Sequence, residues 1–421
     1  MTELSISFDY GEMRDCFKVT LDAGDASKLI QAPEVSPLED FSGKVRRALD
    51  DPIGSLPLKD IVKPGQRILI IISDITRPVG SERFMPVLVD YLNQAGIEDG
   101  DIQILVATGT HREATKEEIE RLLGHGLAGR LQVTSNRAGV AGDFVDLGKT
   151  GRGTPVRINR LAVQADQVIL TGAIGFHFLA GFSGGRKSIL PGIAAQSSIQ
   201  ANHGLVLDAG DKVGQGLMEG NPIAEDMREA AAMLNPSFLL NVVLNDRGEP
   251  AGVFAGDWDQ AHRAGCRFAD QCFGIKLQEK RPLVIAGAGG FPKDLNLYQG
   301  AKGLLNAMEA VEEGGTVIFV AECREGIGAE DYFALAAANR SRQEKEDLLR
   351  REFSIARYIG YLNSLWAKKA TVKLVSKLPE DQVKAMGMEP YGSLEEALAE
   401  VEGGALNNCW LIPRGTGIAI I

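Results

Sequence analysis

The sequence is poor in cysteine and histidine, and each shortage excludes a class of protein. Its 421 residues include 5 cysteines, which are scattered and show no C-x-x-C spacing, and 5 histidines. Disulfide frameworks and zinc ribbons are therefore not expected. The sequence also lacks an HExxH, an HxH or a Cys/His cluster, the patterns that form a metal site from protein ligands alone. A metal bound here would need most of its ligands from another molecule.

Long apolar runs and an excess of positive charge are also missing. No apolar run reaches the roughly 18 residues needed to span a bilayer, and no basic region followed by an apolar stretch opens the sequence. The sequence has 56 Asp+Glu and 45 Lys+Arg, which gives a formal net charge of −11. It contains no run of basic residues. Counterion release therefore cannot drive binding to nucleic acid, although a local cationic pocket could hold a small anion. We expect a cytoplasmic protein without membrane or nucleic-acid partners.

What is present is an alternation of short apolar runs with amphipathic stretches. The run RILIIIS at 67–73 is apolar and β-branched, which is typical of a strand buried on both faces of a parallel sheet. Helices are predicted at 82–96 and at 115–124, where Thr115 and Glu118 have the spacing of a capping box. The stretch 101–112 is predicted as a strand that runs into a Gly/Thr loop, and further strands are predicted at 132–136, 165–175 and 238–245. This alternation predicts an α/β fold with mostly parallel sheets.

The same pattern starts again near residue 280, so we expect two α/β domains. The strand and Gly-rich turn at 281–292, the helix at 296–311 and the strand at 314–323 repeat the architecture. The stretch 252–278 is interpreted as a helix-rich connection, and 409–421 as a closing strand. We divide the chain into an N-terminal domain, 1–275, and a C-terminal domain, 276–421.

Polar residues follow several predicted strands, where open parallel sheets bind their ligands. Three such loops are rich in polar side chains: 73–78, 108–112 and 172–177. They carry Asp74, Arg77, His111 and His177. An arginine at this edge can clamp a carboxylate or a phosphate, and two histidines suit acid/base chemistry at neutral pH. The alternatives are a helix cap for Asp74, a surface ion pair for Arg77 and structural roles for the imidazoles.

The densest polar segment is 175–192, which contains GFSGGRKS. A P-loop pattern could run from 181 to 188, but Arg186 stands where its last glycine must lie, so this alternative is weak. Gly184 and Gly185 could approach a phosphate. Lys187 could serve as a point charge or as an amine for covalent attachment.

Further candidate features have structural alternatives. His203, in QSSIQANHG, could be a metal ligand only if partners were supplied, and packing is the alternative. In the second domain GAGG at 287–290 is too short for the dinucleotide fingerprint. Gln299 and Lys302 share one helical face and could bind a carboxylate, or simply face solvent.

Taken together, these motifs resemble the nickel-pincer lactate racemase family over essentially the whole chain. The segments that carry the resemblance are SDITRP at 73–78, TGTHR at 108–112, GFHFLAGFSGGRKSILPG at 175–192, NH at 202–203 and YQGAK at 298–302. The long third motif is the most specific. The family has two α/β domains that close over an active-site cleft, and it racemises 2-hydroxy acids.

The resemblance implies a role for each candidate residue. Lys187 would hold, covalently, a nickel-pincer nucleotide, which is a pyridinium thioamide-thiocarboxylic acid mononucleotide with nickel, and His203 would be the protein's nickel ligand. His111 and His177 would be the paired acid/base residues. Cofactor contacts would come from Gly184, Gly185 and Asp74. Substrate contacts would come from Arg77, Tyr298, Gln299, Lys302 and Trp366.

The implied reaction avoids removing a very weakly acidic C2 proton. One histidine would take the hydroxyl proton while hydride passes to the cofactor, and the hydride would return to either face of the planar keto acid. The implied substrate is lactate or a related short 2-hydroxy acid, with malate, aromatic and sugar acids as alternatives within the family. Separate enzymes would build the cofactor. A nucleotide-binding enzyme of the P-loop kind and a non-catalytic descendant are the remaining alternatives.

Overall fold

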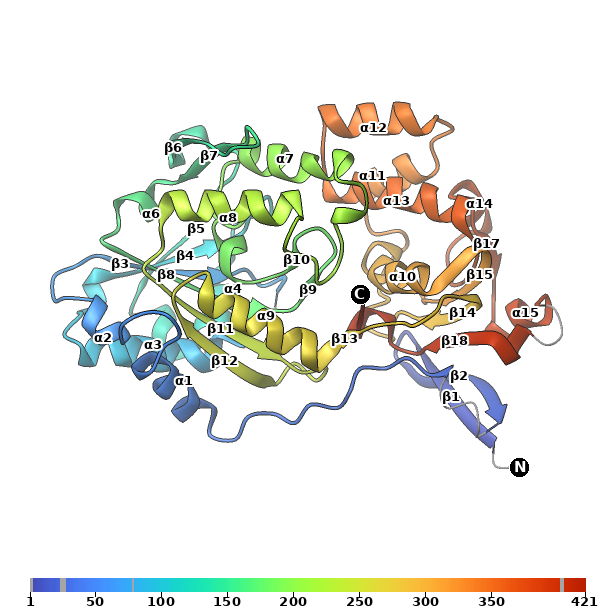
Figure 1. Cartoon of the computed structure of the whole chain (residues 1–421), viewed down its shortest axis with the longest axis horizontal. Helices are drawn as coiled ribbons and strands as arrows, with labels where there is room; N and C mark the ends of the chain where they lie inside the picture. The colour runs from blue at the N-terminus through green and yellow to red at the C-terminus, as the bar shows by residue number, and fades with distance from the viewer. Residues whose placement is uncertain (1–2, 23–27, 78, 402–404) are drawn as a thin grey trace. The chain divides into compact units, whose positions relative to one another are not determined.

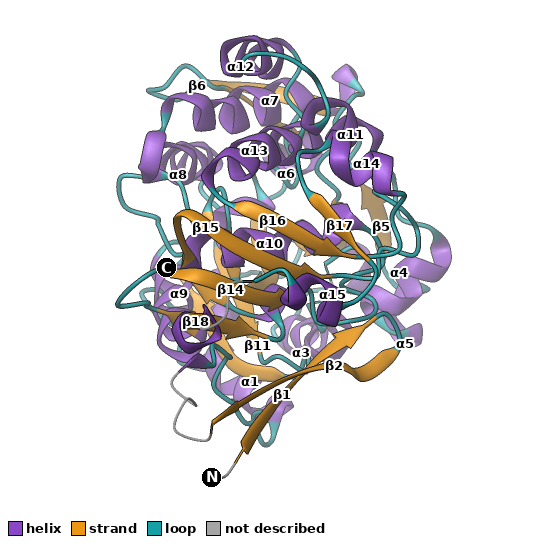
Figure 2. Cartoon of the chain, turned by 90° about the vertical axis from the view of Figure 1, so that its right-hand side faces the viewer, coloured by secondary structure: helices purple, strands orange, loops and turns teal. Residues whose placement is uncertain are grey.

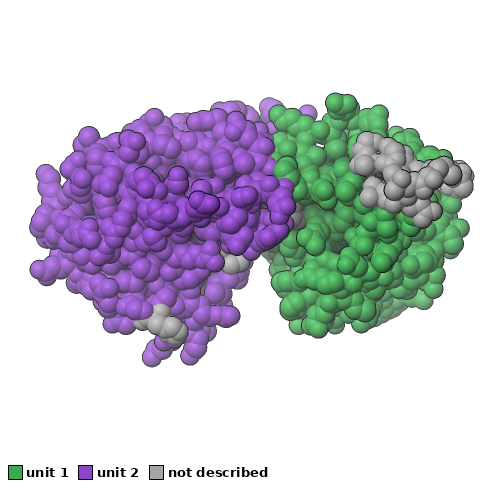
Figure 3. Space-filling model, turned by 90° about the horizontal axis from the view of Figure 1, so that it is seen from below, with its two compact units in different colours: residues 1–33, 273–421 green, residues 34–272 purple. Residues whose placement is uncertain are grey.

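The computed structural model describes residues 3–22, 28–77, 79–401 and 405–421. The chain forms two compact units, which Figure 3 shows in different colours. We call residues 34–272 the central unit, and residues 1–33 together with 273–421 the terminal unit. The first 33 residues thus group with the C-terminal part of the chain. The division at residue 275 that the sequence suggested does not anticipate this grouping.

The central unit is built on a six-stranded sheet with the order β12-β11-β8-β3-β4-β5. Its neighbouring strands are parallel, except that β11 and β12 pair antiparallel. The strands are β3 (Ile68–Ser73), β4 (Ile102–Ala107), β5 (Gln132–Ser135), β8 (Gln167–Ile174), β11 (Phe238–Leu244) and β12 (Pro250–Gly256). In β3 the residues Ile68 to Ile72 are at most 1% exposed, so the apolar run is buried on both faces as expected.

Helices and short two-stranded ribbons complete the central unit (Figure 1). The helices are α1 (Phe41–Asp50), α2 (Leu58–Ile61), α3 (Ser81–Gln94), α4 (Lys116–Leu123), α5 (His125–Ala128), α6 (Arg160–Gln164), α7 (Gln196–Gly204), α8 (Pro222–Leu234) and α9 (Gln260–Phe273). The ribbons pair β6 (Phe144–Lys149) with β7 (Pro155–Asn159), and β9 (Phe176–His177) with β10 (Gly181–Phe182). Helix α4 begins at the predicted capping box, in which Thr115 and Glu118 satisfy each other's backbone amides.

The order of strands explains why distant loops meet. From β3 the chain moves to β4 and β5 on one side, and it later adds β8 and β11 on the other. The strand order therefore reverses at β3 and β8, and ligands in open α/β sheets bind beyond the carboxyl ends of the strands at such a reversal. The loops after β3, β4 and β8 all leave this edge.

The terminal unit contains a five-stranded sheet with the order β17-β16-β15-β14-β18, in which every neighbouring pair is parallel (Figure 2). Its strands are β14 (Arg281–Gly287), β15 (Val311–Val320), β16 (Thr371–Val375), β17 (Glu389–Tyr391) and β18 (Cys409–Ile412). Its helices are α10 (Leu297–Ala310), α11 (Glu330–Ala336), α12 (Arg342–Arg351), α13 (Ile355–Lys369), α14 (Glu380–Ala385) and α15 (Leu394–Ala399). A separate parallel pair joins β13 (Gly274–Ile275) to β19 (Ala419–Ile420).

The N-terminal hairpin belongs to the terminal unit because its apolar face packs there. Strands β1 (Glu3–Tyr10) and β2 (Met13–Asp22) pair antiparallel, and Phe8 is fully buried in one core with Leu283, Ile285 and Leu411. This hairpin was not predicted from the sequence.

The α/β class with mostly parallel sheets in two domains is confirmed, and the predicted strands and helices occur with small shifts at their ends. One expectation holds only in part, and another was wrong. The stretch 252–278 is not only helical, because β12 occupies its start as an antiparallel edge strand. The closing strand at 409–421 is two strands, β18 and β19, which lie in different sheets.

Candidate active site

The loops after β3 and β4 bring Asp74 and His111 into contact. Asp74 Oδ2 lies 2.6 Å from His111 Nδ1. The hydroxyl of Thr76 donates to Asp74 Oδ1 at 2.7 Å and lies 3.4 Å from the same imidazole nitrogen. The carboxylate is buried, whereas the imidazole is 47% exposed. A ring held at one nitrogen by a buried acid and open to solvent is suited to exchanging protons at the other nitrogen.

The carboxylate of Asp74 is held in its ionised form. Burial raises its pKa, but hydrogen bonds from His111 and Thr76 and the charges of His111 and Arg77 outweigh burial, so the pKa lies below its ordinary value. An ionised carboxylate accepts hydrogen bonds only, so His111 carries its proton on Nδ1. The lone pair of the neutral ring is therefore on Nε2, which makes His111 a proton acceptor.

His177, in β9, has the opposite arrangement. Its Nδ1 accepts hydrogen bonds from the backbone amides of Leu179 and Ala180, both at 3.2 Å. The ring also stacks on Phe178, with 5.2 Å between the centroids. A nitrogen that accepts from amides cannot carry a hydrogen, so the neutral ring of His177 has its proton on Nε2.

Lys187 and His203 are both buried in the central unit. Lys187 lies in the short 3₁₀ turn Gly185–Ser188 and is 6% exposed, and His203, in α7, is 4% exposed. Burial lowers the pKa of Lys187 well below its ordinary value, and the charges of Arg77 and Arg186 lower it further. Burial, with the charges of Lys187 and Arg77, lowers the pKa of His203 to about 3. The His203 imidazole is therefore neutral at neutral pH, and burial favours the uncharged form of the Lys187 amine.

The backbone of α7 selects the ring nitrogen that His203 can offer. Its Nδ1 lies 3.0 Å from the carbonyl oxygen of Ile199, which only accepts hydrogen bonds. The proton is therefore on Nδ1 and the lone pair on Nε2. A backbone carbonyl that fixes the tautomer in this way is the usual support for a histidine metal ligand.

Gly184 and Gly185 are required for packing against the protein itself. Both have positive φ values, and a Cβ at Gly184 would lie 2.6 Å from Asn241 Oδ1. A Cβ at Gly185 would lie 2.5 Å from the ring of His262. The amide of Gly185 donates to Asn241 Oδ1 at 2.9 Å. A P-loop would need this amide for a phosphate, so the contact argues against that alternative.

The candidate substrate residues of the terminal unit lie on α10 and α13. Gln299 and Lys302 are exposed and face each other, with Lys302 Nζ donating to Gln299 Oε1 at 3.2 Å. Tyr298 is half-buried, with its ring 6.3 Å from that of Tyr332. Trp366, in α13, is only 9% exposed, so its side chain packs in the protein interior. Arg77, in the central unit, is exposed.

Sequence reasoning missed several groups that hold these side chains in place. Thr76 lay inside a quoted motif but had no role, and its hydroxyl now supports the acid of the Asp74–His111 pair. Asn221 was not singled out, although an Asn before Pro222 is a helix-start signal, and it caps α8. His262 was not singled out either, but its Nε2 lies 2.9 Å from the carbonyl oxygen of Ser183. Arg112 forms a surface ion pair with Glu118.

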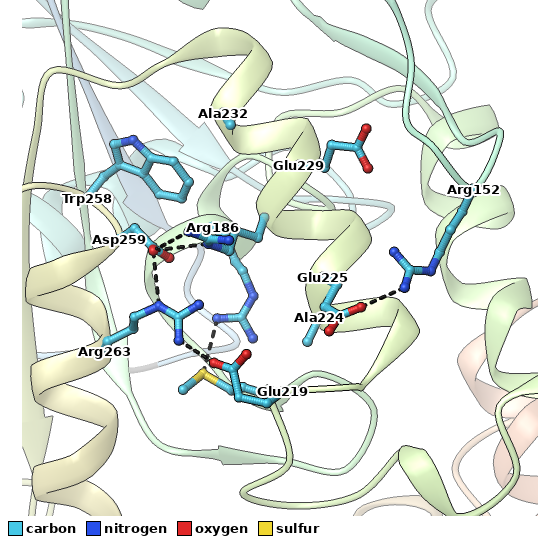
Figure 4. A pocket seen from close by; sticks show the side chains of 12 residues that line it. Arg152, Arg186, Glu219, Ala224, Glu225, Glu229, Ala232, Trp258, Asp259 and Arg263 are labelled. Atoms are coloured by element: carbon cyan, nitrogen blue, oxygen red, sulfur yellow. Dashed lines mark hydrogen bonds and ion pairs between the residues drawn. The ribbon is translucent and has the colours of Figure 1, made fainter.

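A cavity of about 430 Å³ lies beside α8 and the start of α9 (Figure 4). Ion pairs join several of its acidic and basic side chains, as in the pairs of Arg152 with Glu225 and of Arg263 with Asp259. Arg186 reaches into it, but His111, His177, Lys187 and His203 are not among the residues that line it. The acidic and basic side chains that line the cavity balance one another, so we do not place the candidate active site there.

The described part of the chain contains neither a protein-only metal cluster nor a membrane-spanning helix. There, no three His, Cys, Asp or Glu side chains gather as they would around a metal ion. Across the same residues, no helix combines the length and apolar character needed to cross a membrane. A metal held at His203 would thus need further donors from a bound group.

Two family models match the sequence. The lactate racemase N-terminal domain matches residues 10–214, and the lactate racemase C-terminal domain matches residues 277–421. A lactate racemase from Thermoanaerobacterium thermosaccharolyticum is 33% identical over 386 residues, 89% of each chain. A lactate racemase from Lactiplantibacillus plantarum is 34% identical over 387 residues, 89% of this chain and 90% of the relative.

Solved structures agree with this relationship. The lactate racemase apoprotein from T. thermosaccharolyticum has a TM-score of 0.87 and 32% identity, covering 99% of this chain and 100% of that one. A protein from Thermotoga maritima, at 18% identity and a TM-score of 0.67 over 92% of this chain and 98% of that one, shares the fold.

The fold and the site define an α/β protein of two parallel-sheet units, with two histidines beyond the carboxyl ends of the central strands. The domain matches and the sequence identity over most of the chain then identify the family. The chain belongs to the lactate racemase family, whose named members are isomerases.

Proposed function

We propose that the protein racemises a short 2-hydroxy acid, with lactate as the first candidate. The observation that carries the proposal is the Asp74–His111 pair, at 2.6 Å, on the same sheet edge that bears His177 and the segment of Lys187. Lactate is preferred because it is the substrate in the names of both curated relatives.

We further propose that Lys187 and His203 hold the nickel-pincer nucleotide. The residues fit such a group in two ways. A buried lysine amine whose pKa is lowered can form a covalent attachment, and a neutral imidazole with its lone pair on Nε2 can bind a metal. When bound, the cofactor supplies a reversible acceptor for the hydrogen and electron pair at the substrate's C2. Gly184, Gly185 and Asp74 stay proposed cofactor contacts.

The protein's own residues then manage the hydroxyl proton. His111 accepts that proton at Nε2, and the ionised carboxylate of Asp74 stabilises the imidazolium that results. His177 is the proposed acid/base group for the other enantiomer. Arg77 would bind the substrate carboxylate through its guanidinium, a role that suits its exposed position in the loop after β3.

Residues of the terminal unit are proposed to complete substrate binding. Gln299 and Lys302, on the first turns of α10, offer an amide and an ammonium for the carboxylate or the hydroxyl. Tyr298 and Trp366 are proposed to shape the pocket around the rest of the substrate. The cofactor is proposed to come from separate enzymes, so protein made without them would carry an unmodified Lys187.

The attachment can be tested by intact-protein mass spectrometry after maturation with the cofactor-building enzymes. We expect an adduct on the wild-type protein and on Lys212→Ala, which changes an exposed lysine of the same unit. The Lys187→Ala variant should carry none. An adduct of full mass on Lys187→Ala would show that the attachment site is elsewhere.

The activity can be tested by enantiomer-resolved turnover of the cofactor-bearing protein. The panel contains single isomers of lactate, malate, 2-hydroxybutyrate, phenyllactate and gluconate. Racemisation or epimerisation of one member would support the reaction and identify the substrate class. Inactivity on all members, with the adduct confirmed by mass, would contradict the proposed function.

A further inference from the structure

The turn that follows His177 buries two amides whose acceptor is the histidine ring. Strands β9 and β10 pair His177 with Gly181, so the residues between them form a tight turn. Leu179 and Ala180 are both fully buried, and both of their amides donate to His177 Nδ1. Buried amides that lose their acceptor cost free energy, so the turn opposes protonation of Nδ1.

The same turn is held from outside by two buried side chains. Asn221 Nδ2 donates to the carbonyl oxygen of Leu179 at 2.8 Å, and Arg186 Nη2 donates to that of Ala180 at 2.8 Å. Asn221 is fully buried and Arg186 is 3% exposed. Each side chain thus fixes the carbonyl of a residue whose amide contacts the histidine.

Both holding residues are themselves anchored. Asn221 Oδ1 accepts from the amides of Ile223 and Ala224 as the N-cap of α8. Arg186 Nη1 lies 3.3 Å from His262 Nδ1 and 3.6 Å from the sulfur of Met218. His262 Nε2 lies 2.9 Å from the carbonyl of Ser183, so its Nδ1 is an acceptor for Arg186. The turn is therefore tied to α8 and α9.

We infer that Asn221 and Arg186 are positioning residues that act through the 178–180 turn to hold His177 with its proton on Nε2. This inference rests on the proposed acid/base role of His177. It makes the two histidines different before substrate binds. His111 begins with a lone pair on Nε2 and can accept a proton, whereas His177 begins as a hydrogen-bond donor at Nε2.

The proton balance shows what this difference requires. When His111 accepts the hydroxyl proton, the O–H bond breaks, an N–H bond forms at Nε2, and the proton already on Nδ1 stays with the ring. For His177 to accept a proton at Nε2, its present proton must first move to Nδ1. That hydrogen would face the amide hydrogens of Leu179 and Ala180, so the turn must release the ring first.

The tautomers can be read on the apoprotein, without cofactor or substrate. The probe is long-range ¹H–¹⁵N correlation NMR of protein labelled with ¹⁵N-histidine, in which the two tautomers give different cross-peak patterns. Asparagine substitutions at His177 and His111 assign the rings. We expect the Nε2–H pattern for His177 and the Nδ1–H pattern for His111. A wild-type His177 with its proton on Nδ1 would overturn the inference.

Asn221→Asp tests the positioning role, because it keeps the N-cap oxygen and removes the amide donor. In this variant we expect His177 to lose its single Nε2–H pattern while that of His111 stays unchanged. Asn245→Asp is the matched control, since Asn245 also accepts from two amides, those of Arg247 and Glu249, and donates to a backbone carbonyl, that of Val35. An unchanged His177 pattern in a folded Asn221→Asp protein would overturn the role of Asn221.

Arg186→Lys provides a second probe if Asn221→Asp does not fold. It keeps the positive charge but loses the planar fork that reaches Ala180. We expect the same loss of the single pattern at His177, and a retained pattern would overturn the role of Arg186. These spectra need no turnover, so they test the inference separately from the proposed function. If the tautomers are as expected but the protein does not racemise its substrates, the proposed function is contradicted and the inference about His177 is not.

Discussion

The two parallel sheets of this protein share an architecture but use their carboxyl edges differently. Beyond the central sheet, the loops carry Asp74, His111 and His177, with exposed or half-buried imidazoles. Beyond the terminal sheet, the tip of the N-terminal hairpin occupies the edge. There the amide of Gly11 donates to Asp294 Oδ2 at 2.7 Å, and its carbonyl accepts from Phe291 at 2.7 Å.

This comparison teaches that the fold alone does not locate a site. A parallel sheet offers a ligand crevice at its carboxyl edge, but the chain can fill that crevice with its own backbone. In the terminal sheet Asp294 also accepts from the amide of Glu322, and Glu322 pairs with Lys377 and Arg324. Substitutions at the central edge should therefore act mainly on turnover, and substitutions at the terminal edge should act mainly on stability.

The largest expected effect comes from His111→Ala at the central edge. Removing the proton acceptor should lower racemisation by about 10²- to 10⁴-fold in both directions, the usual contribution of general acid/base catalysis. Both directions must change equally, because two enantiomers have the same free energy. Chiral chromatography of the product measures the rate, and Thr110→Ala, an exposed neighbour, is the control. Loss of bound nickel from His111→Ala would instead make His111 a metal ligand.

Asp74→Asn should have the next largest effect. An amide cannot stabilise the imidazolium of His111 as a carboxylate does, so we expect a loss of turnover of roughly 10²-fold. Wild-type levels of turnover would show that the contact between Asp74 and His111 is only structural.

Acid unfolding gives Asp74→Asn a second readout. The lowered pKa of Asp74 means that its stabilisation is fully present above the unfolded value of about 3.9, and is lost as pH falls through the folded value. The variant lacks this contribution. Its melting temperature should therefore fall less than that of the wild type between neutral pH and pH values below about 4.

Gly11→Ala, at the terminal edge, should lower stability while turnover changes little. Gly11 has φ +56°, and a Cβ would lie 1.9 Å from Glu322 Oε2. We expect a loss of about 1–3 kcal/mol in the unfolding of the terminal unit, measured by urea denaturation. Gly314→Ala is the control, because it has φ +75° in the same unit with nothing within 4 Å of its Cβ. A Gly11→Ala protein with wild-type stability would contradict the tight docking of the hairpin.

Local sequence was enough to predict the elements whose physical cause is local. The β-branched run of β3 and the capping box of α4 needed no distant partner. The hairpin could not be predicted to dock on the terminal sheet, because Gly11 and Asp294 are 283 positions apart in the chain. Strand β12 was missed because an antiparallel edge strand interrupts the pattern of alternating parallel strands and helices.

The candidate site was predicted in its residue types but not in its protonation. The motifs named His111, His177, Lys187 and His203, and the loops after β3, β4 and β8 explain why the first two share a sheet edge. Which ring nitrogen each histidine uses depends on Asp74, on the amides of the 178–180 turn and on the carbonyl of Ile199. Backbone contacts of this kind leave no signature in the sequence.

The most direct test of the central claim is racemisation of unlabelled lactate in D₂O by the cofactor-bearing protein, with the product analysed by mass spectrometry. If hydrogen leaves C2 with its electron pair and returns from the cofactor, the product should keep protium at C2 while the hydroxyl exchanges with solvent. Incorporation of deuterium at C2 at the rate of racemisation would mean that a histidine abstracts the C2 proton directly, and this would contradict the proposed mechanism.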